Sequence, residues 1–156
     1  MAVTLSRDDA RIRRRVPVRS SGRRGIQMEK NLHIVLNLLK RELEFLEHGG
    51  YKRSPASPWR APYMFEESPS CPNHLDRTRQ TRCEDCWLMQ FVPDDLHSEQ
   101  VPCRFVPLTT EGLTVDTLYR CATSAESEEA LRAWLRQHIR EIEREISEAR
   151  AVRFEA

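Results

Sequence analysis

Four of the five cysteines lie between positions 71 and 103, in a spacing that suits metal coordination. The segment Cys71-Pro72-Asn73-His74 is followed after eight residues by Cys83-Glu84-Asp85-Cys86, and Cys103 comes after sixteen more. Two ligands three positions apart can share one tight turn and point at the same ion. Structural zinc takes four such ligands in a tetrahedron. The spacing therefore predicts a metal site whose candidate ligands are Cys71, His74, Cys83, Cys86 and Cys103.

Two ligand sets stay open, one of four cysteines and one of three cysteines with His74. We favour the all-cysteine set, because His74 lies in a polar turn where an unbound histidine is stable. If Cys103 is not a ligand, it would need to be buried elsewhere as a core residue, which free cysteines commonly are. The two Cys/His knuckles, from Cys71 to Cys86 or at most to Cys103, resemble the treble-clef and zinc-ribbon type. That resemblance implies metal ligation and nothing about a substrate.

Other chemistry is compatible with the same cysteines. An iron-sulfur cluster also takes four thiolates, although the chain has no compact CxxCxxC run. A dithiol oxidoreductase could use Cys83 and Cys86, but Glu84 and Asp85 would disfavour the thiolate that this chemistry needs. The chain shows neither an apolar run long enough for a membrane span nor the apolar stretch of a secretory signal, which predicts a cytoplasmic location. Thiols stay reduced in that compartment, so clustered cysteines, odd in number, favour metal binding or redox chemistry over disulfides.

The charges divide the chain into a basic tail and an acidic body. Residues 1–27 hold eight arginines and two aspartates, a charge of +6, whereas the other 129 residues carry 17 basic and 22 acidic side chains, a charge of −5. We expect 1–27 to be disordered, and it remains open whether they are translated or whether translation starts at Met28. No apolar run approaches the roughly 20 residues of a membrane span.

Arginines near the cysteines have two interpretations. The tail together with Arg77, Arg79 and Arg82 would suit a nucleic-acid-binding module, since clustered basic groups are the footprint of phosphate binding. Alternatively, these three and Arg104 offset the charge of about −2 that four thiolates and one zinc ion carry. We favour the second interpretation, because Glu84 and Asp85 would repel phosphate.

The surrounding elements are predicted to be helical. Apolar residues recur three and four apart over 28–48, up to Gly49-Gly50, and again over 124–150, where Thr123 and Glu126 form a capping box. Within the second helix, Glu128 and Arg132 are spaced to form an ion pair. Region 51–122 is rich in proline, which excludes long regular elements. We predict a mainly α single domain over 28–150: two long antiparallel helices bracket an irregular zinc-knuckle segment with at most short strands, and 151–156 form a C-terminal tail.

These features favour a small non-catalytic zinc-binding protein that acts as a protein-interaction or regulatory module. No HExxH, GxSxG or glycine-rich phosphate loop is present. The first helix has an apolar surface wider than one packing partner usually covers. Either its own chain packs against two sides of it, or a protein partner or a second copy of the chain covers one side through the helices. An iron-sulfur redox or sensor protein and a nucleic-acid-binding module are the alternatives.

Overall fold

The computed structural model describes residues 21–154, with side chains from Lys30 to Val152. Three helices form the framework, α1 (Ser21–Glu47), α2 (Val115–Cys121) and α3 (Ser124–Phe154). Residues 21–154 contain no β-strand, and Pro107 and Thr114 form an isolated antiparallel bridge. The prediction of a mainly α protein is confirmed.

The helix ends differ from the predicted boundaries. α1 begins at Ser21, seven residues before the predicted start of the helix at Met28. Extending an existing helix by a turn is much easier than starting one, and the packed turns beyond Met28 supply the start. α3 likewise continues to Phe154, into the predicted C-terminal tail. The predictions for residues 1–20 and 155–156 lie outside the described residues.

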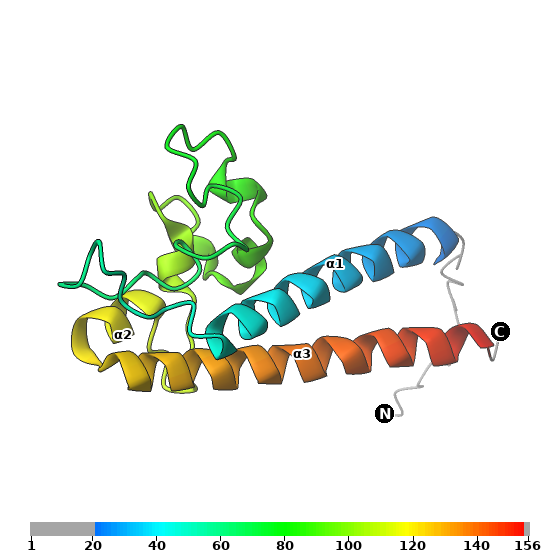
Figure 1. Ribbon diagram of the computed structural model, residues 1–156. Helices are drawn as coiled ribbons and strands as arrows, with labels where there is room; N and C mark the ends of the chain where they lie inside the picture. Colours follow the sequence, from blue (N-terminus) through cyan, green and yellow to red (C-terminus); the bar gives the residue numbers. More distant parts are fainter. Residues whose placement is uncertain (1–20, 155–156) are drawn as a thin grey trace, which may run out of the picture.

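α1 and α3 lie side by side and run in opposite directions (Figure 1). Their apolar stripes face each other: Leu39 of α1 and Leu131 and Leu135 of α3 are wholly buried. Burying one such side chain contributes roughly 1.5–3 kcal/mol, so this contact is a main source of stability. None of the described helices is long and apolar enough to cross a membrane.

A glycine pair ends α1. The Gly49 N–H donates to the Leu46 carbonyl at 2.9 Å and the Gly50 N–H to the Phe45 carbonyl at 2.9 Å. Gly49 has φ 76°, the left-handed conformation that closes many helices and that glycine adopts without steric cost. The chain thus leaves α1 sharply and enters the region between the two long helices.

That region forms a lobe beside the C-terminal half of α1 (Figure 1). Apart from α2, its regular pieces are four short 3₁₀ turns, Cys83–Asp85, Trp87–Phe91, Asp94–Leu96 and Pro102–Phe105. Aromatic rings join the lobe to α3, since the centroid of Trp134 lies 4.9 Å from that of Phe91 and 5.7 Å from that of Phe65. The lobe and the helices therefore share one hydrophobic core.

Candidate metal centre

Four of the predicted ligands line one small cavity in the lobe. Its volume is about 30 Å³, and its wall includes the side chains of Cys71, Cys83, Cys86 and Cys103. The fifth candidate, His74, lines a separate polar groove instead. The fold thus brings together cysteines from three separate segments and directs His74 elsewhere.

Each of these segments presents its cysteine on a tight turn. The His74 N–H donates to the Cys71 carbonyl at 3.0 Å, and the Cys86 N–H donates to the Cys83 carbonyl at 3.0 Å. Cys103 lies in the 3₁₀ turn Pro102–Phe105, which begins with a proline whose missing N–H would have no partner there. Both knuckle spacings therefore correspond to closed turns, the geometry that lets two side chains point the same way.

The cavity is otherwise largely apolar, with Phe65, Leu88 and Met89 in its wall. Burial raises the pKa values of the Cys71, Cys86 and Cys103 thiols, because a thiolate would lose its hydration there. In the part of the chain that the structure describes, no three or more Cys, His, Asp or Glu side chains are arranged to hold a metal ion. A metal would therefore have to draw the four sulfurs together and displace their protons.

The loop between the two knuckles is closed by one side chain. The Asn73 amide donates to the Thr81 carbonyl at 2.8 Å, and its oxygen accepts from the Thr81 N–H at 3.1 Å. Inside this closed loop Leu75 and Arg79 have φ values of 63° and 46°, which side chains other than glycine rarely adopt. The loop thus holds a defined conformation that is strained at two positions.

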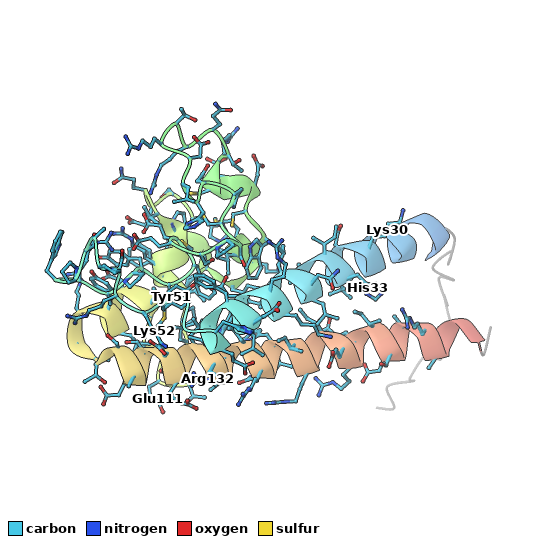
Figure 2. All side chains as sticks on the ribbon, in the orientation of Figure 1. Lys30, His33, Tyr51, Lys52, Glu111 and Arg132 are labelled. Carbon is cyan, nitrogen blue, oxygen red and sulfur yellow. The ribbon has the colours of Figure 1, made fainter. Side chains whose placement is uncertain are left out.

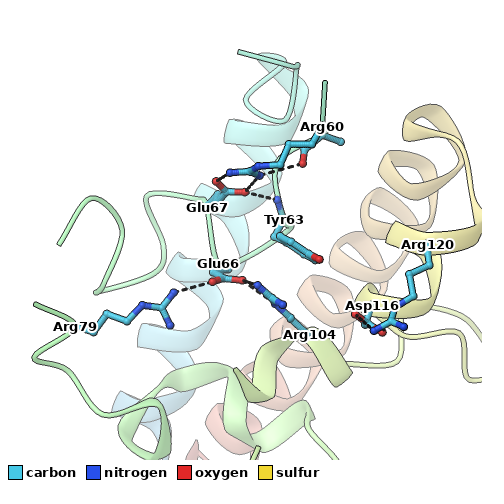
Figure 3. Close-up of polar contacts among 9 residues, drawn as sticks. Arg60, Tyr63, Glu66, Glu67, Arg79, Arg104, Asp116 and Arg120 are labelled. Atoms are coloured by element: carbon cyan, nitrogen blue, oxygen red, sulfur yellow. Dashed lines mark hydrogen bonds and ion pairs between the residues drawn. The ribbon is translucent and has the colours of Figure 1, made fainter. Parts of the chain in front are cut away.

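Glu66 ties the loop to the segment that carries Cys103. Its carboxylate accepts from Arg79 at 2.7 Å and from Arg104 at 2.7 Å (Figure 3). Arg82 pairs with Glu84 instead. Three of the four arginines expected to offset thiolate charge therefore pair with carboxylates, although the charge of Arg79 still acts to lower the pKa of Cys71. The reason is that Glu66, although remote from Arg104 in sequence, lies beside it in the fold.

Sequence reasoning missed a buried carboxylate beneath the lobe. Glu42 of α1 is wholly buried and accepts hydrogen bonds from the hydroxyls of Tyr51 and Ser68. Tyr51 lies where α1 meets the lobe (Figure 2) and accepts from the Phe65 N–H at 2.8 Å. Burial raises the pKa of Glu42, because the charged form is desolvated. A signal was present: Glu42 lies three positions after Leu39, in phase with the apolar stripe.

The sequence matches no protein-family model. It is similar to no curated protein, and no solved structure matches it. A functional proposal for this chain must therefore rest on its own residues and their arrangement.

Proposed function

We propose that the chain is a small non-catalytic zinc-binding protein that serves as a protein-interaction or regulatory module. Cys71, Cys83, Cys86 and Cys103 would hold the ion. The observation that carries this proposal is their convergence on one cavity although they come from three segments of the lobe. Four thiols are a common donor set of structural zinc sites.

The size of the cavity favours a single ion over an iron-sulfur cluster. A volume of about 30 Å³ holds a body of about the size of a water molecule. A cluster of several iron and sulfide atoms would need the lobe to open considerably. The iron-sulfur alternative therefore has less support than zinc, although it uses the same four thiols.

A structural role follows from the number of ligands. Four protein ligands fill the tetrahedron around zinc and leave no position for a substrate or a water molecule. The lobe also lacks a β-ladder or a long helix of its own among the described residues, so its backbone is held mainly by turns. Metal binding would supply the cross-links that such a segment otherwise lacks.

The interaction role rests on what the lobe exposes. Leu75, in the loop between the knuckles, is 89% exposed, and Trp59, in the loop after α1, is 75% exposed. Large exposed apolar side chains on well-positioned loops suit contact with a protein partner. A nucleic-acid partner has less support, because Arg79 and Arg82 already pair with carboxylates that a phosphate would have to displace.

Metal analysis of anaerobically purified full-length protein tests the proposal. We expect one zinc per chain, no visible charge-transfer absorption, and loss of the zinc together with a lower melting temperature in Cys83→Ser. Cys121→Ser is the matched control, since Cys121 is exposed and does not line the cavity. If the purified protein contains iron and sulfide instead of zinc, the iron-sulfur alternative is correct. Stoichiometric zinc in Cys83→Ser would show that the proposed site is wrong.

A further inference from the structure

A second cavity, separate from the cysteines, lies where the loop after α1 meets α2 and the first turns of α3. Its volume is about 390 Å³, within the range of sites that hold small organic molecules. Four stretches of chain contribute to it: residues 51–64, α2, the α2–α3 junction and the start of α3. The metal proposal assigns no role to this cavity.

One side of the cavity is apolar and aromatic. Met64 and Val115 are buried in its wall, and Trp59 lines it while remaining largely exposed. Tyr119 also lies in the wall, and its ring stacks on that of Tyr63 with 3.8 Å between the centroids. This stacking holds the Tyr119 ring in place. A flat apolar group would find matching surfaces here, and it would cover part of Trp59.

The α3 side of the cavity offers unused hydrogen-bonding groups. Ser127 lines the cavity and is only 7% exposed, yet its hydroxyl makes no hydrogen bond to another described residue. Every fully buried side-chain oxygen and nitrogen in the described part has a partner, so this hydroxyl must open to the cavity. The N–H groups of Ser124 and Ala125, at the start of α3, also have no intrahelical acceptor.

Two opposite charges also line the cavity without ion-pair partners. Arg53 bonds only to the Pro58 carbonyl, at 3.3 Å, and forms no ion pair within the described residues. Glu128 is likewise unpaired there, because Arg132, its expected partner, pairs with Glu129. The third charged residue of the lining, Arg60, is neutralised by Glu67 through bonds of 2.7 and 2.8 Å.

The two charges have a defined relation to α3. Glu128 lies four positions after Ser124, so its carboxylate shares a helix face with the Ser124 hydroxyl of the first turn, and both residues line the cavity. That first turn favours an anion, and a carboxylate one turn farther on favours a cation beside it. A ligand that satisfies both must carry its two charges close together.

We propose that this cavity binds a free α-amino acid with an aromatic side chain. Its carboxylate is received by Arg53 and the first turn of α3, its ammonium group by Glu128, and its ring by the surface that includes Trp59. Because none of these residues lines the cysteine cavity, the proposal does not depend on metal binding.

Isothermal titration calorimetry on the full chain tests the ligand class with three probes. L-Phenylalanine carries both charges, 3-phenylpropanoate lacks the ammonium group, and 2-phenylethylamine lacks the carboxylate. We expect L-phenylalanine to bind at least about tenfold more tightly than either analogue, since each lost charge removes a charge-assisted hydrogen bond. No binding of L-phenylalanine at millimolar concentration, or equal affinity for all three, would overturn the proposal.

Two variants locate the site. In Glu128→Gln, L-phenylalanine should lose its advantage over 3-phenylpropanoate and keep its advantage over 2-phenylethylamine, and Arg53→Gln should show the reverse. Glu129→Gln is the control, because Glu129 is the neighbouring residue on α3 but does not line the cavity. Affinities that are the same in all three variants as in the unchanged chain would place any binding elsewhere and contradict the assignment.

Discussion

The Glu42 carboxylate on α1 accepts a hydrogen bond of 2.7 Å from the hydroxyl of Ser68, which lies 26 residues farther along the chain. Ser68 precedes Cys71 by three residues, and its carbonyl accepts from the Cys71 N–H at 3.1 Å. A buried polar network therefore links the first long helix to the segment that enters the candidate metal centre. Buried networks of this kind fix one arrangement of their members, because any unpaired member is costly.

Removing this carboxylate should destabilise the protein strongly. Glu42→Ala leaves the hydroxyls of Tyr51 and Ser68 without their buried acceptor, and we expect a loss of about 3 kcal/mol in the free energy of unfolding. Urea denaturation gives the measurement. Glu47→Ala, which breaks an exposed pair with Arg136, should cost less than about 1 kcal/mol. Equal losses in the two variants would show that the buried network stabilises the fold no more than an exposed ion pair does.

The same residue predicts a pH dependence. Burial raises the pKa of Glu42 above its ordinary value of 4.5, so the folded chain binds more protons than the unfolded chain between the two values. Stability from this group is therefore fully present below about pH 4.5 and decreases as the pH rises through the raised value.

Comparison with Glu42→Gln isolates this effect. Glu67, whose pKa is lowered by its hydrogen bonds to Arg60, gives a pH dependence of stability opposite in sign to that of Glu42. Because Glu67 is present in both proteins, its contribution cancels in the difference between them. As the pH rises above 4.5, the free energy of unfolding of the original chain should fall relative to that of Glu42→Gln. Urea unfolding of both proteins across this pH range is the measurement. A difference independent of pH would contradict the prediction.

The fourth metal ligand can be decided by two substitutions. Because Cys103 lines the cysteine cavity and His74 lines another groove, Cys103→Ser should lose stoichiometric zinc whereas His74→Ala should retain it. The metal content of both purified variants is the measurement. The opposite result would establish the set of three cysteines and one histidine.

Glu66 should matter more for stability than its position on a loop suggests. Its side chain is only 14% exposed and accepts from two arginines, so we expect Glu66→Gln to lower the free energy of unfolding by about 2 kcal/mol. Glu84→Gln is the control, since the Arg82–Glu84 pair is exposed on both sides and should change stability by less than about 0.5 kcal/mol. Chemical denaturation of both variants tests this, and indistinguishable midpoints would refute it.

Relief of strain should stabilise the loop between the knuckles. Leu75 has φ 63° and is almost fully exposed, so Leu75→Gly removes a steric penalty of roughly 1–2 kcal/mol and little buried surface. The greater freedom of glycine in the unfolded chain offsets part of this, leaving an expected gain of up to about 1 kcal/mol. Leu113→Gly, at a position without positive φ, should instead destabilise the protein. A thermal scan of both variants measures the effect, and a lower melting temperature in Leu75→Gly would contradict it.

Features set by neighbouring residues could be predicted well. The capping box is present, with the Thr123 hydroxyl accepting from the Glu126 N–H at 3.2 Å and the Glu126 carboxylate accepting from the Thr123 N–H at 2.8 Å. Gly49 closes α1 as the pattern indicated. Such contacts span only a few residues, so the sequence nearby contains all the groups that make them.

Features that join distant segments could not be predicted. One local prediction is wrong as well, because Arg132 of α3 pairs with Glu129 rather than with Glu128. The pairing of Glu66 with Arg104 spans 38 residues of irregular chain. Nothing in the local sequence indicates which of the many arginines and carboxylates will meet, because their distance is decided by how the lobe packs on the helices.

The sequence by itself determined the two long helices and the five candidate ligands, because helical periodicity and the spacing of cysteines on a turn are local properties. Only the tertiary structure decided that Cys103 faces the same cavity as Cys71, Cys83 and Cys86 while His74 faces another groove. The same packing buried Glu42 among hydroxyls that come from the lobe. The physical reason is that these outcomes depend on which surfaces exclude water together, and that is a property of the whole fold rather than of any segment.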